Sequence, residues 1–501
     1  MKLLFSIAFT FLYATTFGAE KTQLSFTIND GNGTLLPARV HLYDADGKPV
    51  NPRQSSLPFF KDHFVCDGAA LVEVPVEKLR YEIERGPEWS AARASIVIAE
   101  GQTLPVTETL TRFVDLSHEG WWCGETHIHR PLNDVPLLMR AEDLHVGMVI
   151  TWWNDNSAWK DAAAPTTPAT QFDGDRFLHP LGGEDERGGG ALLYFGLKTP
   201  LPLAGIPGRT REWPSSAKWL DDARAMGTAW IDAEKPFWWD FPIWLARGVD
   251  SIGIANNHLN RSGVYDGEAW GRARDLAAFA GPHGNGLYSQ TLYYRALNCG
   301  LRVPPSAGGA SGVLPNPVGY NRLYVHCDGP LTWEKWLDGW RAGRVFVTNG
   351  PLLRLTVNGE LPGATLRTTP GPLEVQIEGR LDSRDRIAKV ELVHNGRVEA
   401  VQLPARVTVK ESGWFLVRAI TDIPETFRFA STGPWYVELD GKPAPLNRAD
   451  AQFFLDWTRE RAAQVEKAVA DPEQRAEALR PVREAEEFWR KKIAAALGSL
   501  E

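Results

Sequence analysis

The stretch Gly120-Trp-Trp-Cys-Gly-Glu-Thr-His-Ile-His-Arg130 carries the strongest local signal in this chain of 501 residues. Side chains i and i+2 of a β-strand face the same side, so His127 and His129 can share one metal ion. Neutral imidazoles suit zinc and similar transition metals, and a catalytic site keeps one coordination position open for water. A His-x-His pair is weak on its own, because core or surface histidines also produce it.

The sequence around this stretch, residues 114–348, alternates between apolar runs and helix-like segments. The runs at 147–151, 192–195 and 249–254 predict buried strands, and the segments at 216–226 and 268–280 predict helices. Alternation of this kind predicts an α/β domain with a largely parallel sheet.

Both flanks of this region show a different pattern. Residues 20–113 and 349–446 contain short runs of period-two alternation separated by Asp-Gly and Asn-Gly turns, which predict two β-sandwich domains. Residues 447–501 carry apolar stripes at helical spacing on either side of Asp471-Pro472-Glu473, a capping sequence. A C-terminal helical hairpin is therefore expected.

Residues 1–19 have the features of a signal peptide, namely Lys2, an apolar stretch and small residues near Ala19. Secretion or export to the periplasm is expected, with no integral membrane segment left after cleavage. The net charge of -8 and the lack of a Lys/Arg-rich patch argue against a nucleic-acid partner. The four cysteines fit either two disulfides or buried free thiols.

The motif Gly124-Glu-Thr-His-Ile-His129 resembles the Gly-Asp-x-His-x-His opening of the polymerase and histidinol phosphatase (PHP) superfamily. The likeness is closer to its CehA/McbA branch, because Arg85-Gly-Pro-Glu88 precedes the motif and Arg341-Ala-Gly-Arg-Val-Phe-Val-Thr-Asn-Gly-Pro351 closes the domain. The resemblance implies a distorted (β/α)7 barrel of PHP type as the central α/β domain. It also implies a metal-dependent hydrolase of esters, carbamates, amides or phosphoesters.

The sequence departs from this family at several ligand positions. Thr151-Trp-Trp-Asn-Asp155 stands where Thr-Asp-His is usual, and Ser306-Ala-Gly-Gly309 keeps no ligand. A one-metal site is therefore expected instead of the family's trinuclear one. Its candidate ligands are His127, His129, Glu184, Glu234 and His258, and Glu186 competes with Glu184.

Zinc is the first expectation for the ion, with manganese or iron as alternatives. Asp155 or a spare carboxylate is the candidate general base, and Lys235 and Arg130 are candidates to stabilise an oxyanion. Each candidate also has a structural interpretation: an ion pair between Glu234 and Lys235, a pair between Arg130 and Asp134, or a turn capped by His258.

The expected partner is a small-molecule or carbohydrate substrate. Twenty tryptophans, several of them in pairs such as Trp152-Trp153 and Trp238-Trp239, leave a second hypothesis open. It is a decayed barrel that binds carbohydrate by stacking sugar rings on exposed indoles. The alternative is that these rings form a large aromatic core.

Overall fold

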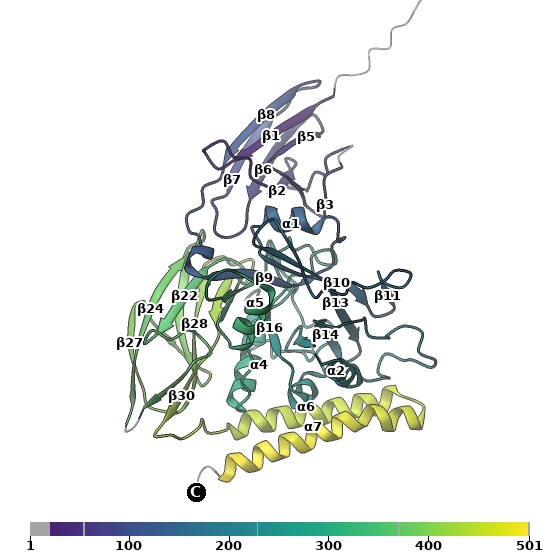
Figure 1. Ribbon diagram of the computed structural model, residues 1–501, viewed down its shortest axis with the longest axis vertical. Coiled ribbons are helices and arrows are strands. Elements are labelled where there is room, and N and C mark those ends of the chain that lie inside the picture. The colour runs from purple at the N-terminus through teal and green to yellow at the C-terminus, as the bar shows by residue number, and fades with distance from the viewer. Residues whose placement is uncertain (1–20, 54–55, 228, 369–370, 499–501) are drawn as a thin grey trace, which may run out of the picture.

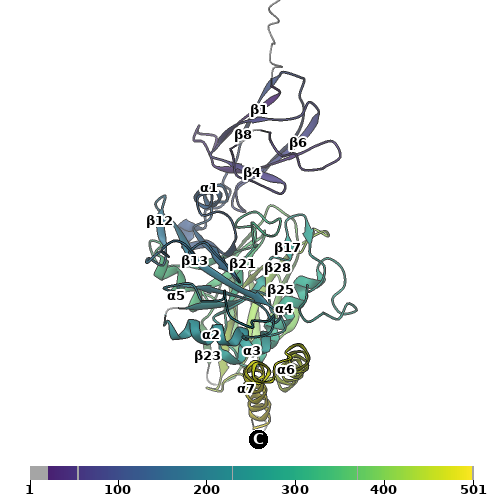
Figure 2. The ribbon, with the colours of Figure 1, turned by 90° about the vertical axis from the view of Figure 1, so that its right-hand side faces the viewer.

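The structure is a computed structural model that describes residues 21–53, 56–227, 229–368 and 371–498. The signal peptide expected at residues 1–19 lies outside them. Two perpendicular views place the N-terminal strands at one end of the long axis, and helices α6 (Arg448–Ala468) and α7 (Pro472–Gly498) at the other (Figure 1, Figure 2). Within the described residues, no helix combines the length and apolarity needed to cross a membrane.

The N-terminal module consists of two sheets that enclose one hydrophobic core. Period-two alternation builds this core, since Leu24, Phe26 and Ile28 point inward from one strand while the residues between them are half-buried. The sheet orders are β5-β1-β8 and β3-β4-β2-β6-β7. The strands are β1 (Gln23–Asn29), β2 (Ala38–Tyr43), β3 (Phe59–Phe60), β4 (His63–Cys66), β5 (Ala69–Glu73), β6 (Lys78–Glu84), β7 (Ala92–Val97) and β8 (Thr103–Thr109).

The central region is built on a mixed sheet. The strands of this sheet in the region are β9 (Trp121–Ile128), β10 (Val146–Trp153), β11 (Asn156–Ser157), β12 (Thr170–Phe172), β13 (Arg176–Arg187), β14 (Gly190–Phe195), β15 (Trp230–Ala233), β16 (Ser251–Ala255), β19 (Pro305–Ala307), β20 (Arg322–His326) and β21 (Val345–Thr348). A separate two-stranded sheet consists of β17 (Leu259–Asn260) and β18 (Gly263–Val264). Its helices are η1 (Ser117–Glu119), α1 (Val135–Ala141), α2 (Ser216–Ala225), α3 (Phe241–Arg247), α4 (Gly284–Asn298) and α5 (Trp333–Arg341).

The expected (β/α)7 barrel of PHP type is wrong for this region. Strands account for 37% of the structure and helices for 21%. Parallel pairs (β9–β10, β10–β13, β15–β16, β16–β19) are interrupted by antiparallel ones (β13–β14, β14–β15, β20–β9). Only Gly188 and Gly189 separate β13 from β14, and so short a connection makes a hairpin instead of a helical crossover.

The helix expected at residues 268–280 is not observed either. The carboxylate of Glu268 accepts a hydrogen bond from the backbone N–H of Arg274 and pairs with its guanidinium, which stabilises an irregular loop. The nearest helix, α4, begins beyond this loop at Gly284.

The C-terminal strands continue the central sheet. β21 pairs with β29, so backbone hydrogen bonds connect the two regions that were expected to separate at residue 348. A further sheet has the order β22-β24-β27. The strands are β22 (Leu352–Val357), β23 (Thr365–Thr368), β24 (Leu373–Asp382), β25 (Ile387–His394), β26 (Arg397–Ala400), β27 (Ala405–Val409), β28 (Gly413–Thr421), β29 (Phe429–Thr432) and β30 (Trp435–Leu439).

Helices α6 and α7 pack against each other and against α3. The side chain of Asn447 caps α6 by accepting a hydrogen bond from the N–H of Asp450. Phe454 of α6 stacks on Trp489 of α7 with ring centroids 4.7 Å apart, and Trp489 donates a hydrogen bond to the carbonyl of Pro242. The hairpin therefore covers the central region instead of standing free.

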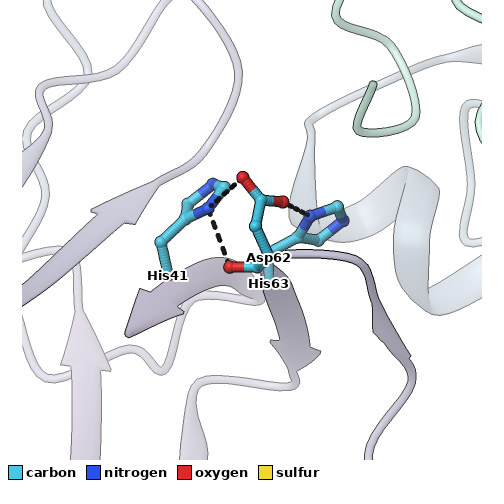
Figure 3. Close-up of side chains that lie close together, drawn as sticks. All are labelled: His41, Asp62 and His63. Atoms are coloured by element: carbon cyan, nitrogen blue, oxygen red, sulfur yellow. Dashed lines mark hydrogen bonds and ion pairs between the residues drawn. The ribbon is translucent and has the colours of Figure 1, made fainter. Parts of the chain in front are cut away.

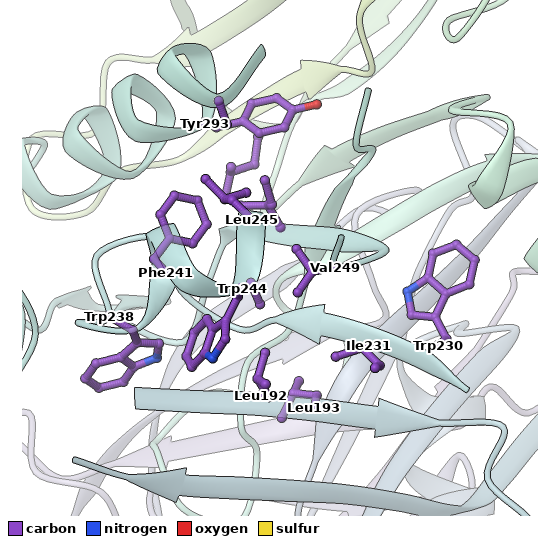
Figure 4. Close-up of a cluster of buried hydrophobic side chains, with 14 of the residues drawn as sticks. Leu192, Leu193, Trp230, Ile231, Trp238, Phe241, Trp244, Leu245, Val249 and Tyr293 are labelled. Atoms are coloured by element: carbon purple, nitrogen blue, oxygen red, sulfur yellow. The ribbon is translucent and has the colours of Figure 1, made fainter. Parts of the chain in front are cut away.

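Most tryptophans belong to one large apolar core. Figure 4 shows Trp244 close to Leu192, with Trp238 beside it and Trp230 at the far side of the same cluster. The fully buried indoles are those of Trp238, Trp244, Trp336, Trp340, Trp435, Trp457 and Trp489. All four cysteines are buried free thiols, so the disulfide alternative does not apply.

Candidate metal centre

The structure brings His127 and His129 together at the end of β9. The Nε2 atoms of the two imidazoles lie 3.0 Å apart. β9 is an inner strand between β10 and β20, and the backbone N–H of His129 donates to the carbonyl of Ser311, which fixes the chain just after the strand. Gly308 packs against His127 so closely that an added Cβ would lie 2.4 Å from the His127 Cβ.

Glu184 completes a set of three with these histidines, in which His127 and Glu184 are buried and His129 is half-buried. Its Oε2 lies 3.1 Å from Nε2 of His129 and 3.5 Å from Nε2 of His127. Donors bound to one zinc at about 2.1 Å in a tetrahedron would be about 3.4 Å apart. The three separations match the edges of such a coordination polyhedron.

Glu234 lies on the other side of His127. Its Oε1 is 3.5 Å from Nδ1 of that ring, while its Oε2 forms an ion pair with Nζ of Lys235 and accepts a hydrogen bond of 3.0 Å from the indole of Trp238. A carboxylate behind a histidine ligand sets the orientation of the ring and raises its basicity. Glu234 is therefore placed to orient His127, and the expected ion pair between Glu234 and Lys235 is present.

Three buried atoms of this group form no hydrogen bond within the described part of the chain. They are Nδ1 of His127, Oε2 of Glu184 and Oε1 of Glu234. Buried polar atoms are almost always partnered, and two imidazole nitrogens cannot both carry a proton at 3.0 Å from each other. A cation among His127, His129 and Glu184 would partner Oε2 of Glu184 and accept a lone pair from each Nε2, so these side chains fit a metal ion. Nδ1 of His127 and Oε1 of Glu234 face each other at 3.5 Å on the other side of the ring.

The ionisation of these four side chains also favours a bound cation. Burial alone would lower the pKa of His127, but Glu184 and Glu234 outweigh it and raise that pKa to about 10. Burial lowers the pKa of His129. Despite burial, the two imidazoles hold the pKa of Glu184 well below its usual range, and Lys235 and His127 lower that of Glu234 to about 2. Both carboxylates are therefore ionised at neutral pH, and a divalent ion would replace the proton that His127 otherwise holds.

Two expected catalytic side chains lie away from this group. The Asp155 side chain is 67% exposed and forms an ion pair of 2.6 Å with Arg209. Arg130 is buried with its guanidinium 4.9 Å from the ring centre of Phe60 in the N-terminal module. Neither geometry suits the catalytic role expected for these residues.

His258 is buried near Lys235 and Glu234 but forms different contacts. Its Nδ1 is 3.0 Å from the carbonyl of Gly267, and its ring packs 5.3 Å from that of Phe237. Burial and the charge of Lys235 lower the pKa of His258 to about 4, so the imidazole is neutral. The observed contact of His258 is a hydrogen bond that holds a loop, which agrees with the structural interpretation of this residue and not with a metal ligand.

Sequence reasoning missed two acids that support the centre. Glu125 accepts hydrogen bonds from the backbone N–H groups of Gly309 and Gly319, and burial raises its pKa to about 7. Asp232 accepts hydrogen bonds from the hydroxyls of Ser251 and Ser306. Glu125 could have been found, since it stands two residues before His127 on the same strand.

The tryptophans near the centre offer little open surface. Trp152 and Trp238 are buried, and the half-buried Trp153 packs against His129 with ring centroids 5.0 Å apart. Trp270 is the more exposed ring, and it is sandwiched between Trp238 and Arg211. These indoles thus serve mainly as packing around the histidines.

Neither a scan against protein-family models nor a search of curated proteins returned a match to the chain. The function is therefore argued from the geometry of this site.

Proposed function

We propose that the protein is a metal-dependent hydrolase whose ion is held by Nε2 of His127, Nε2 of His129 and Oε2 of Glu184. The observation that carries the proposal is the convergence of these three atoms at separations of 3.0 to 3.5 Å. Two imidazoles and one carboxylate are a ligand set of catalytic zinc sites, with a fourth position for water. Manganese and iron are the alternatives.

The surrounding side chains have separate tasks in this proposal. A zinc ion bound here would supply water activation and polarise the oxygen of a carbonyl or phosphoryl group. Glu234 orients His127, and Lys235 keeps the charge of Glu234 balanced in the buried site. Glu186 stands two residues after Glu184 on β13 and shares its face of the strand, which makes it the carboxyl group available to accept a proton.

The bond class remains that of the sequence resemblance: an ester, carbamate, amide or phosphoester. Because the central fold differs from the expected barrel, the CehA/McbA resemblance is a secondary support and the ligand geometry is the main one. The sugar-binding alternative has less support, since Trp152 and Trp238 are buried. We also propose export from the cytoplasm, on the sequence of residues 1–19.

The test is metal content and hydrolysis by the full chain and its His127→Ala/His129→Ala variant. The variant should lose one equivalent of bound zinc by elemental mass spectrometry. Its activity on a panel of aryl esters, carbamates and phosphoesters should fall by about 1,000-fold or more, because a catalytic metal contributes several kcal/mol to transition-state stabilisation.

Asp155→Asn is the matched control. The sequence placed this carboxylate in the catalytic site, but in the structure it is exposed and paired with Arg209. This variant should keep both the zinc and the activity. Unchanged zinc content in the double histidine variant, or equal activity with and without the two imidazoles, would refute the proposal.

A further inference from the structure

A second group of metal-ligand side chains lies in the N-terminal module. His41 on β2 and His63 on β4 are directly paired across these antiparallel strands, so their side chains share one face of the sheet. The two ring centroids are 5.3 Å apart. Asp62 ends the turn before β4, and Figure 3 shows its carboxylate between the two imidazoles.

The two histidines approach this carboxylate with the same ring atom. Nδ1 of His63 lies 2.8 Å from one oxygen of Asp62, and Nδ1 of His41 lies 3.3 Å from the other. Both imidazoles are buried, with relative exposures of 0% for His41 and 2% for His63. Donor atoms of all three residues lie within 4.8 Å of one another.

Nδ1 of His41 has more oxygen neighbours than a hydrogen bond requires. The carbonyl of Asp62 is 3.1 Å away, the carboxylate of Asp62 is 3.3 Å away, and the hydroxyl of Tyr43 is 3.3 Å away. One N–H points in one direction and serves one of these oxygens well. Distances of 3.1 to 3.3 Å between this nitrogen and each oxygen are close to the separation of about 3.4 Å expected for two donors that bind one cation at about 2.1 Å.

Burial and mutual hydrogen bonds set the ionisation of these three groups. Burial, together with the charge of Arg39, lowers the pKa of both imidazoles, to about 3 for His63. Despite burial, the hydrogen bonds from the two rings lower the pKa of Asp62 far below its usual range. The charge of Arg39 is itself held by ion pairs with Glu84 and Glu142.

We propose that His41, Asp62 and His63 hold a divalent transition-metal ion that is separate from the catalytic one. Two nitrogen donors and one carboxylate favour zinc over magnesium or calcium, which take oxygen ligands. The ion would join β2 to the turn before β4, inside the module. Its role is therefore structural, and the inference does not depend on the proposed hydrolase activity.

The experiment counts zinc in the full chain after chelator treatment and reconstitution with zinc alone. The unaltered protein should bind two equivalents. His41→Gln/His63→Gln should bind one and keep its hydrolytic activity, whereas His127→Ala/His129→Ala should bind one and lose its activity. In the second variant, added zinc should still raise the melting temperature, because the remaining ion binds only the folded module.

Asp62→Asn provides a test that does not remove buried rings, and it decides the matter if His41→Gln/His63→Gln fails to fold by circular dichroism. Its zinc content should also fall to one equivalent. Two equivalents in Asp62→Asn, or none in His127→Ala/His129→Ala, would overturn the inference and leave a cluster held by hydrogen bonds only. If the unaltered protein and His127→Ala/His129→Ala both hold one equivalent while Asp62→Asn holds none, the module site stands and the proposed catalytic centre fails.

Discussion

His127 is held from three directions, which makes it the best-positioned side chain of the candidate centre. Glu234 faces its Nδ1, His129 and Glu184 face its Nε2, and Gly308 packs against its Cβ. These contacts favour a single ring orientation, so His127 would lose little conformational entropy when it binds a metal.

Gly308→Ala should therefore weaken zinc binding at His127 by about 10- to 100-fold, in the range seen when groups that orient a ligand are altered. The added methyl group would lie 2.4 Å from the His127 Cβ and has to displace it. Competition for zinc with a chromogenic chelator measures the change. Gly263→Ala is the control, because no atom lies within 4 Å of its new Cβ. Equal affinity in both variants would contradict the role given to Gly308.

The positions of the two histidines could be predicted from the sequence better than those of their neighbours. The histidines depend on local strand geometry, whereas their neighbours depend on contacts between residues far apart in the sequence. The i, i+2 rule for a strand is local, and it brought His127 and His129 together correctly. Asp155 was misplaced because Asn154 has a φ of 50° and turns the chain into the short β10–β11 hairpin, which carries Asp155 to the surface. Glu184 depends on the pairing of Trp153 with β13, and such register is not visible in one sequence.

At the scale of elements, strands at 24–28 and 38–43 and a helix at 216–226 could be predicted from periodicity, and they are observed as β1, β2 and α2. The order of strands in the central sheet could not. The triple glycine at 188–190 decides it, because it allows β13 and β14 to form a hairpin under Trp238, where a Cβ on Gly190 would lie 2.2 Å from that side chain. An apolar run alone does not distinguish parallel from antiparallel neighbours.

Packing between elements predicts how substitutions in α7 change the stability of the protein. Trp489 is fully buried, stacks on Phe454 and donates to the carbonyl of Pro242, so Trp489→Ala should lower the free energy of unfolding by about 3–5 kcal/mol. Urea denaturation followed by circular dichroism measures this loss. Trp489→Phe should cost less, and Lys491→Ala, at an exposed position, should stay within about 0.5 kcal/mol. A small effect of Trp489→Ala would mean that the hairpin is not part of the cooperative core.

At the scale of the whole molecule, buried polar contacts join the N-terminal module to the central sheet. Asp143 accepts hydrogen bonds from Trp89 and Arg112 of the module and from Arg176 of β13. Glu88 accepts hydrogen bonds from the backbone of Leu116 and from the hydroxyl of Tyr324. This interface therefore couples the stability of the two regions to the ionisation of its acids.

Glu88 makes that coupling measurable. Burial raises its pKa from 4.5 to about 7, so the folded state binds the proton more tightly than the unfolded state. The contribution of Glu88 to stability is then full below pH 4.5 and is lost as the pH rises through 7. The advantage of the wild type over Glu88→Gln in free energy of unfolding should fall by on the order of 3 kcal/mol between pH 4.5 and 7.5.

Chemical denaturation of both proteins across this pH range checks the prediction. Glu425→Gln, an exposed substitution, controls for general effects of removing a carboxylate. A difference between wild type and Glu88→Gln that does not change with pH, or that changes in the opposite direction, would show that Glu88 is ionised in the folded protein at low pH.

The position of helices α6 and α7 also affects the order in which the protein can be made. Arg461 of α6 pairs with Asp240 just before α3, and α3 follows the loop that carries Glu234 and Lys235. About 200 residues separate α3 from α6, so a ribosome adding 5–20 residues per second needs roughly 10–40 s to supply the cover. We therefore expect the side of α3 that α6 and α7 cover in the folded protein to stay uncovered during that interval, in which transiently exposed apolar surface favours aggregation.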